Sequence, residues 1–178
     1  DPHKFFAVST ILREGEPKDE VIRVAEEIDT DLIIMGSRGL KRLQSILENS
    51  VSQYVFQLSA KPMLLVKDDV YVKRINRIMV ALNSSAAAQE SLNLALRLLR
   101  ENKGGKIILA HVNPDLADRK ELTASEAERD ALLAPAVAAA KQQGVAYQCV
   151  AMSGKPGEEI CRIAETTNAD LLVLGSPD

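Results

Sequence analysis

The 178 residues include 46% hydrophobic and 26% charged side chains, a composition typical of a globular protein with a sizeable core. The formal net charge of -3 and the 3% of aromatic residues argue against a general nucleic-acid binder, which usually has a basic face and stacking aromatics. No apolar run approaches the roughly 20 residues that span a bilayer, so we expect no membrane insertion. The only two cysteines lie outside any metal-ligand spacing, and we expect both to be buried in a protein of the reducing cytoplasm.

Short β-branched and leucine-rich runs alternate with longer amphipathic stretches in the first third of the chain, which is typical of βαβ units. Pro17, followed by two acidic residues, marks a helix start, and a buried strand ends at Gly36. The elements expected here are a strand over residues 6–13, a helix over 17–28, a strand over 31–35, a helix over 51–58 and a strand over 62–66.

The same alternation resumes after a charged stretch, residues 67–76, which we interpret as a linker. Gly104 and Gly105 end one helix, Gly144 ends another, and Pro135 is expected to interrupt the latter. The expected elements are a strand over 77–82, a helix over 86–101, a strand over 106–112, a polar loop over 113–123, a helix over 125–143, a strand over 145–152, a helix over 156–168 and a strand over 170–174.

Part of the sequence occurs twice, 139 residues apart. Of the 24 residues from Gly15 to Arg38, ten are identical to the residues 139 positions later. A repeat of this length indicates a duplicated domain, because solenoid and propeller repeats recur every 20 to 50 residues or so. We therefore expect residues 1–70 to be the C-terminal half of one repeat and residues 76–178 the N-terminal three-quarters of a second, so that the chain begins inside one domain and stops inside the next.

The loop over residues 36–51 is the main candidate for a ligand-binding site. It runs from the carboxyl end of a predicted parallel strand to a helix start, where open α/β sheets bind ligands. Glycines at 36 and 39 allow close approach to an anion, and Arg38, Lys41 and Arg42 add positive charge. A purely structural explanation remains open at this point, because the glycines also suit a tight turn and Ser50 with Gln53 fits a capping box.

These residues resemble the universal stress protein family. Its nucleotide-binding signature is Gly-x-x-Gly, nine residues, then Gly and Ser or Thr, after a strand of the Asp-Leu-Ile-Val-Met type. The chain has Asp-Leu-Ile-Ile-Met over residues 31–35, Gly36, Gly39 and, after nine residues, Asn49 and Ser50. Asn49 departs from the third glycine and places a β-carbon where phosphate would approach, although Asn tolerates positive φ. Residues 80–85 and 109–112 resemble two further strand-end motifs of the family.

The resemblance implies a doubly wound α/β parallel sheet of order 3-2-1-4-5, in tandem repeats of the adenine nucleotide alpha hydrolase-like type. It also implies a cytoplasmic stress-response or signalling module that binds ATP or a related adenine nucleotide, possibly with Mg. The contacts it implies are Gly36, Ser37, Arg38, Gly39, Asn49, Ser50 and Val51 in the first copy, with Asn83 and Val112 in the second. The second copy's loop looks degenerate, because Asp178 stands where the second glycine belongs.

Several residues of types common in active sites are expected to have structural roles instead. His111 lies in an apolar strand and is expected to be a hydrogen-bonded structural residue, and the acidic pairs of two first helical turns suit the helix dipole. No catalytic group and no metal site can be assigned, so turnover beyond slow ATP hydrolysis is not expected. The alternative function is an interaction module of the same fold that binds no nucleotide. The resemblance places the strand over 62–66 at an assembly edge, predicting a homo-oligomer or a pseudo-dimer of repeats.

Overall fold

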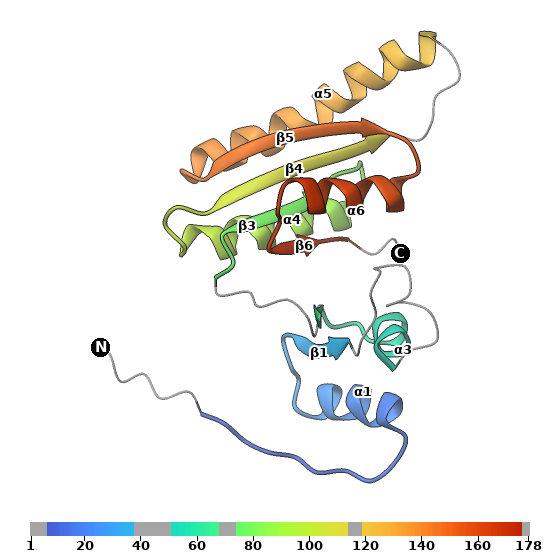
Figure 1. The fold of residues 1–178 in the computed structure, drawn as a ribbon. Coiled ribbons are helices and arrows are strands. Elements are labelled where there is room, and N and C mark those ends of the chain that lie inside the picture. The colour runs from blue at the N-terminus through green and yellow to red at the C-terminus, as the bar shows by residue number, and fades with distance from the viewer. Residues whose placement is uncertain (1–6, 38–50, 68–73, 114–118, 176–178) are drawn as a thin grey trace. The chain divides into compact units, whose positions relative to one another are not determined.

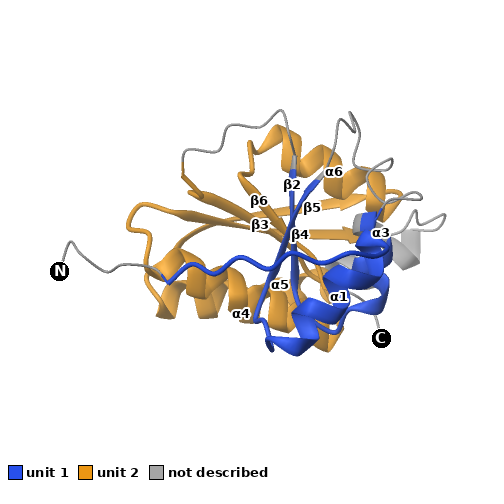
Figure 2. Cartoon of the chain, turned by 90° about the horizontal axis from the view of Figure 1, so that it is seen from below, with its two compact units in different colours: residues 1–71 blue, residues 72–178 orange. Residues whose placement is uncertain are grey.

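The computed structural model describes residues 7–37, 51–67, 74–113 and 119–175 (Figure 1). The chain divides into two compact units, residues 1–71 and residues 72–178, which are coloured separately in Figure 2 and are described one at a time. In the described part of the chain, no helix is long and apolar enough to cross a membrane.

Unit 1 is a small helix-and-strand layer. Its elements, in chain order, are α1 (Pro17–Glu27), β1 (Ile33–Ser37), α3 (Val51–Leu58) and β2 (Met63–Lys67). Proline occupies the first turn of α1, where its missing N–H costs no hydrogen bond, and acidic residues complement the helix dipole there. β1 and β2 pair in parallel, and a small core of buried apolar side chains joins them to the helices: Ala25, Ile33 and Val55.

The strand predicted over residues 6–13 is wrong. Residues 7–14 belong to no helix or strand, and Val8 and Leu12 are 85% and 95% exposed. The segment 139 residues later is β5, which pairs with the neighbouring strand β4 over its whole length. A strand is stabilised only by a partner strand, and the described part of unit 1 supplies none for residues 7–14.

Unit 2 contains a four-stranded sheet in which every pair is parallel, in the order β5-β4-β3-β6. Figure 1 shows its helices running along both sides of these strands. In chain order, its elements are β3 (Arg77–Ala81), α4 (Ala86–Arg100), β4 (Lys106–Asn113), α5 (Arg119–Gln142), β5 (Ala146–Ser153), α6 (Pro156–Thr166) and β6 (Leu171–Val173).

The sheet of unit 2 is covered on both faces, which confirms the doubly wound fold. Alternate residues of β3 and β4 point to opposite sides. Ile78, Val80, Ile107 and Leu109 pack with α4 and α5, whereas Met79, Ile108 and Ala110 pack with Ile163 of α6. The strand order of unit 2 corresponds to positions 3-2-1-4 of the predicted sheet, and the β1-β2 pair of unit 1 corresponds to positions 4-5.

Helix α5 differs from the prediction at two points. It begins at Arg119, within the stretch 113–123 that the sequence predicts to be a polar loop, and it continues through Pro135 rather than stopping there. An interior proline removes one hydrogen bond and strains the preceding turn. The helix continues because Leu133, Ala136 and Ala140, on either side of the proline, are buried against the sheet.

Candidate functional site

The predicted phosphate loop starts at the carboxyl end of β1. Gly36 and Ser37 are the last two residues of that strand, in register with Val66 and Lys67 of β2. Val51 is the first residue of α3 and is 40% exposed. The other predicted contacts of this loop, Arg38, Gly39, Asn49 and Ser50, lie outside the described residues, so the structure shows the two ends of the loop and not its course.

Among the described residues, none lies on the side of Gly36 where a side chain would be. A β-carbon built on Gly36 meets no described atom within 4 Å. Its counterpart in the second copy, Gly175, is tightly packed. A β-carbon on Gly175 would come within 2.6 Å of the backbone carbonyl carbon of Ala87 in α4. Packing within the protein therefore requires glycine at 175, and no described contact requires it at 36.

At the carboxyl edge of unit 2, Asn83 forms the turn between β3 and α4. Its side-chain oxygen accepts hydrogen bonds from the backbone N–H and the hydroxyl of Ser85, at 2.9 and 2.6 Å. Ser85 in turn caps α4 by accepting from the backbone N–H of Ala88. Val112, the other predicted contact in this unit, is half-buried near the end of β4 and packs on the α6 side of the sheet.

His111 joins the ends of β3 and β4. Its imidazole is 5% exposed, with Nδ1 2.8 Å from the carbonyl oxygen of Leu82 and Nε2 2.7 Å from Oδ1 of Asn113. A carbonyl oxygen can only accept, so Nδ1 carries a hydrogen. The prediction of a hydrogen-bonded structural histidine is confirmed, and the side chain fixes the residues that flank Asn83 and Val112.

Several of the residues shared by the two copies form the same corner at the start of a helix, α1 or α6. Gly15 and Gly154 have φ angles of 149° and 146°, which favour glycine, and the carbon chains of Glu20 and Glu159 lie 3.0 Å from the position that a β-carbon would take. Each glutamate pairs with an arginine three residues later, Arg23 or Arg162. These shared residues are therefore explained by local structure and give no evidence for a ligand.

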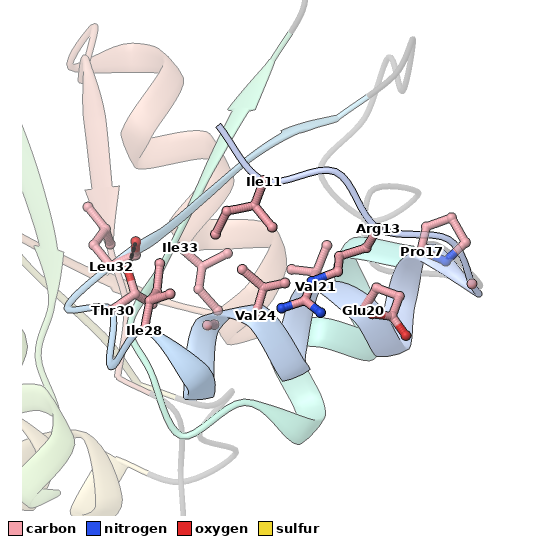
Figure 3. Close-up of a pocket in the computed structure, with 12 residues that line it drawn as sticks. Ile11, Arg13, Pro17, Glu20, Val21, Val24, Ile28, Thr30, Leu32 and Ile33 are labelled. Atoms are coloured by element: carbon pink, nitrogen blue, oxygen red, sulfur yellow. Dashed lines mark hydrogen bonds between the residues drawn. The ribbon is translucent and has the colours of Figure 1, made fainter. Parts of the chain in front are cut away.

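A cavity of about 450 Å³ lies in unit 1, beside α1 (Figure 3). Its walls are the apolar face of α1, residues 11–15 and the start of β1, with Val24 and Ile33 pointing into it. In unit 2 the corresponding face of α6 is covered by Met79, Ile108 and Ala110 of the two central strands. The cavity therefore occupies the position that β3 and β4 hold in the second copy, and we assign it no ligand.

The remaining reactive groups form no recognisable centre. Within the ranges that the structure describes, no group of three histidine, cysteine or acidic side chains could hold a metal ion. The expected burial of both cysteines is wrong, because Cys149 is exposed on the edge strand β5 and Cys161 is half-buried in α6. Partial burial raises the pKa of both thiols, and the negative charge of Glu165 also raises the pKa of Cys161, so neither favours the thiolate.

The fold of this chain is shared with solved structures. A universal stress protein from Archaeoglobus fulgidus superposes with a TM-score of 0.67 and 28% identity, over 91% of this chain and 55% of that one. A protein of the same family from Burkholderia pseudomallei superposes with a TM-score of 0.51 and 25% identity, over 60% of this chain and 85% of that one. These neighbours define the class as α/β proteins of the adenine nucleotide alpha hydrolase-like fold.

Sequence comparison defines the family. The model of the universal stress protein family matches residues 3–67 and 74–178, and the chain therefore belongs to this family. The universal stress protein MJ0577 of Methanocaldococcus jannaschii is 44% identical over 62 residues, which are 35% of this chain and 38% of that protein. Universal stress protein YxiE of Bacillus subtilis is 43% identical over 58 residues. The chain thus spans well under two thirds of the length of these curated relatives.

Proposed function

We propose that the chain is part of a cytoplasmic stress-response or signalling protein that binds ATP or a related adenine nucleotide, with or without Mg. The phosphates lie against the loop over residues 36–51, with Gly36, Ser37, Arg38, Gly39, Asn49, Ser50 and Val51 as contacts. In unit 2, taken by itself, Asn83 has the ribose-side or phosphate-side position of that repeat, and Val112 has the base-side position.

One observation carries this proposal: Gly36 ends a parallel strand, no described atom occupies the place of its β-carbon, and the loop that follows has the family's glycine and serine spacing. Backbone N–H groups in a glycine-containing loop and the dipole of the helix that follows it both favour negative charge, which suits phosphate. Membership of the universal stress protein family agrees with a role in the stress response.

We further propose that residues 1–70 are the C-terminal half of one repeat and residues 76–178 the first three-quarters of the next. The 139-residue periodicity and the two-part match to the family model support this arrangement. In this arrangement only the first copy keeps the phosphate loop, because Asp178 in the second copy would repel a polyphosphate.

The test is nucleotide binding by protein shown to be free of nucleotide after purification. Ligand at about 100 times its dissociation constant stabilises a fold by roughly 2.7 kcal/mol, which raises the melting temperature measurably. We expect this shift with MgATP and its loss in Gly39→Asp, which adds a side chain and a negative charge. Ser153→Ala, at an exposed position of β5, is the matched control. The absence of a shift at millimolar MgATP would refute the proposal.

The second candidate is an interaction module without nucleotide, favoured by the place of β2 at the end of the β1-β2 sheet. An apolar edge strand is a template for another strand, and β2 has the sequence Met-Leu-Leu-Val-Lys. Sedimentation at increasing concentration distinguishes the two functions. Self-association that Leu64→Lys abolishes, in protein that binds no ATP, would establish the interaction module.

A further inference from the structure

The two outer strands of the sheet in unit 2 differ in length and exposure. Within the described ranges, β5 pairs only with β4, and β6, at the opposite end of the sheet, pairs only with β3. β6 has three residues, none of them exposed, whereas β5 has eight residues, of which six are exposed. β5 is therefore the longer and more open edge of this sheet (Figure 1).

Apolar side chains are exposed on both faces of β5. Tyr147 lies on the α5 side of the sheet, where Nζ of Lys141 is 5.8 Å from the centre of its ring. Val150 packs on the α6 side, and Met152 shares that side because side chains alternate along a strand. Tyr147 and Met152 are each 38% exposed. Since both faces are exposed to a similar extent, β5 lacks a neighbouring strand rather than a helix over one face.

β5 has none of the features that usually protect an edge strand. Its sequence, Ala-Tyr-Gln-Cys-Val-Ala-Met-Ser, contains no proline and no charged residue. It pairs with β4 residue for residue from Ala146 to Ser153, without a bulge. Proteins normally prevent edge-to-edge pairing with charges, prolines, bulges or short strands. The outer N–H and C=O groups of β5 bond to no described strand, and they suit the addition of one.

A second copy of β5 is a suitable partner for this edge. The strand carries no charge, so two copies meet without repulsion between like charges. Most homo-oligomers have twofold symmetry, in which the same patch serves both copies, and an antiparallel pair of identical strands has this symmetry. The axis then passes at one residue of the strand, and the two central residues of β5 are Cys149 and Val150.

Side-chain size favours the register centred on Cys149. With the axis at this residue, Tyr147 faces Ala151, and Met152 faces Ala146, so each large side chain meets a small one. A register centred on the next residue would instead place Met152 opposite the long side chain of a glutamine. Cys149 is itself exposed, so its thiol is not held in the core of unit 2.

We propose that β5 is a dimerisation edge, at which a second copy of the chain adds its own β5 in antiparallel orientation about Cys149. The four-stranded sheets of the two copies then join into one continuous sheet. The exposed apolar side chains on each face pack against those of the partner strand. This interface belongs to a different sheet from β2, and it does not depend on nucleotide binding.

The first test is disulfide cross-linking of the full chain at Cys149, in a Cys161→Ser background. Opposite residues of an antiparallel pair have Cα atoms roughly 4.5–5.5 Å apart, which a disulfide spans, so the thiol oxidant diamide should link two copies. The matched control moves the thiol to the end of the same strand, with Cys149→Ala and Ser153→Cys. Its two Cα atoms would lie roughly 27 Å apart, and cross-linking should fall at least tenfold. Equal cross-linking at the two positions, or none at Cys149, would overturn the proposal.

The second test separates pairing at β5 from pairing at β2. Cys149→Lys places two positive charges opposite each other at the axis, so it should weaken dimerisation at least tenfold in sedimentation experiments. Ser153→Lys, at the end of the strand, and Leu64→Lys, in β2, should leave this dimer intact, and circular dichroism checks that each variant is folded. Self-association that Cys149→Lys leaves unchanged, or that only Leu64→Lys weakens, would exclude the β5 interface, whatever the result with ATP. The cross-linking result decides the case if Cys149→Lys does not fold.

Discussion

The same sequence segment occupies two environments in this chain. Residues 15–36 in unit 1 and residues 154–175 in unit 2 share the corner, the helix and the start of the strand. In unit 2 the apolar face of α6 lies on the central strands, and Ile163 is 2% exposed. In unit 1 the equivalent face of α1 borders the open cavity, and Val24, the counterpart of Ile163, is only half-buried. The segment therefore keeps its local structure without the strands that cover it in unit 2.

This comparison distinguishes shared residues that have the same structural role in both units from those that do not. The glycine, proline and glutamate of the corner have the same geometry in both copies, so local structure explains them. Gly175 packs against α4, and Gly36 has no such contact in the described part of unit 1. The identity of the two glycines thus does not show that they have the same role.

The largest difference in stability between equivalent substitutions is expected on the apolar faces of α6 and α1. Ile163→Ala should lower the free energy of unfolding of unit 2 by about 2–5 kcal/mol, because it leaves a cavity among Met79, Ile108 and Ala110. Val24→Ala, at the equivalent position of α1, should cost about 1 kcal/mol or less, because Val24 already borders open space. Urea unfolding of both variants measures the difference. Equal losses would show that the cavity in unit 1 is filled in solution.

The glycines at the two strand ends provide the next contrast. Gly175→Ala should destabilise the protein by about 1–3 kcal/mol, because the added carbon would overlap Ala87. Gly36→Ala should change stability by less than about 0.5 kcal/mol and should reduce only nucleotide affinity. Thermal unfolding and ATP titration of both variants make the comparison. A large loss of stability in Gly36→Ala would indicate that residues outside the described ranges pack against Gly36.

A smaller effect is expected at the helix C-termini, where both copies have a non-glycine residue with positive φ. Asp29 and Asn168 have φ angles of 48° and 50°. Asn168→Gly should raise stability by about 0.4–1 kcal/mol, because glycine adopts this conformation without steric cost. Asp29→Gly should gain less, because it also removes the ion pair with Lys61. Chemical denaturation measures both, and destabilisation by Asn168→Gly would contradict the steric explanation.

The smallest effect concerns this ion pair, whose acidic residue Asp29 corresponds to the uncharged Asn168 in unit 2. Lys61 Nζ lies 2.6 Å from Asp29 Oδ1, and this hydrogen bond and the positive charge lower the pKa of Asp29. Because the folded pKa lies below the unfolded value of about 4, the pair contributes above pH 4 and its contribution is lost as the pH falls through the folded pKa. NMR titration of the Asp29 carboxyl should show a low pKa that Lys61→Met raises. The effect should shrink in 1 M salt, since Asp29 is exposed.

The sequence predicted those parts of the fold that depend on nearby residues. Apolar runs such as Ile-Ile-Met and Ile-Ile-Leu, with proline and glycine at the helix boundaries, were sufficient to predict six strands and the helices between them. The prediction of a strand over residues 6–13 was wrong because pairing depends on a partner strand that local sequence does not specify. The prediction that Pro135 interrupts α5 was wrong for a similar reason. Burial of Leu133 and Ala136 against distant strands outweighs the cost of the proline.

The candidate site could be predicted only in part. Spacing identified Gly36 and Ser50, and a resemblance to known strand-end motifs identified Asn83 and Val112. The bond of Asn83 to Ser85 and the link from His111 to Leu82 are contacts between side chains and backbone that no spacing rule gives. A cavity of about 400 Å³ between α4 and α5 was not predicted either. The two helices that line it are about 50 residues apart in the sequence and meet only because both pack on the sheet.

The corner that begins at Gly15 and Gly154 has a consequence for exchanging the two segments by protein engineering. In each corner the glycine and the glutamate that lies over it are within six consecutive residues, and the arginine that pairs with the glutamate follows three residues later. Exchange of one segment for the other at this point would keep the glycine and its glutamate together. Chimaeras joined at Gly15 or Gly154 should therefore fold at the seam regardless of which unit supplies each side.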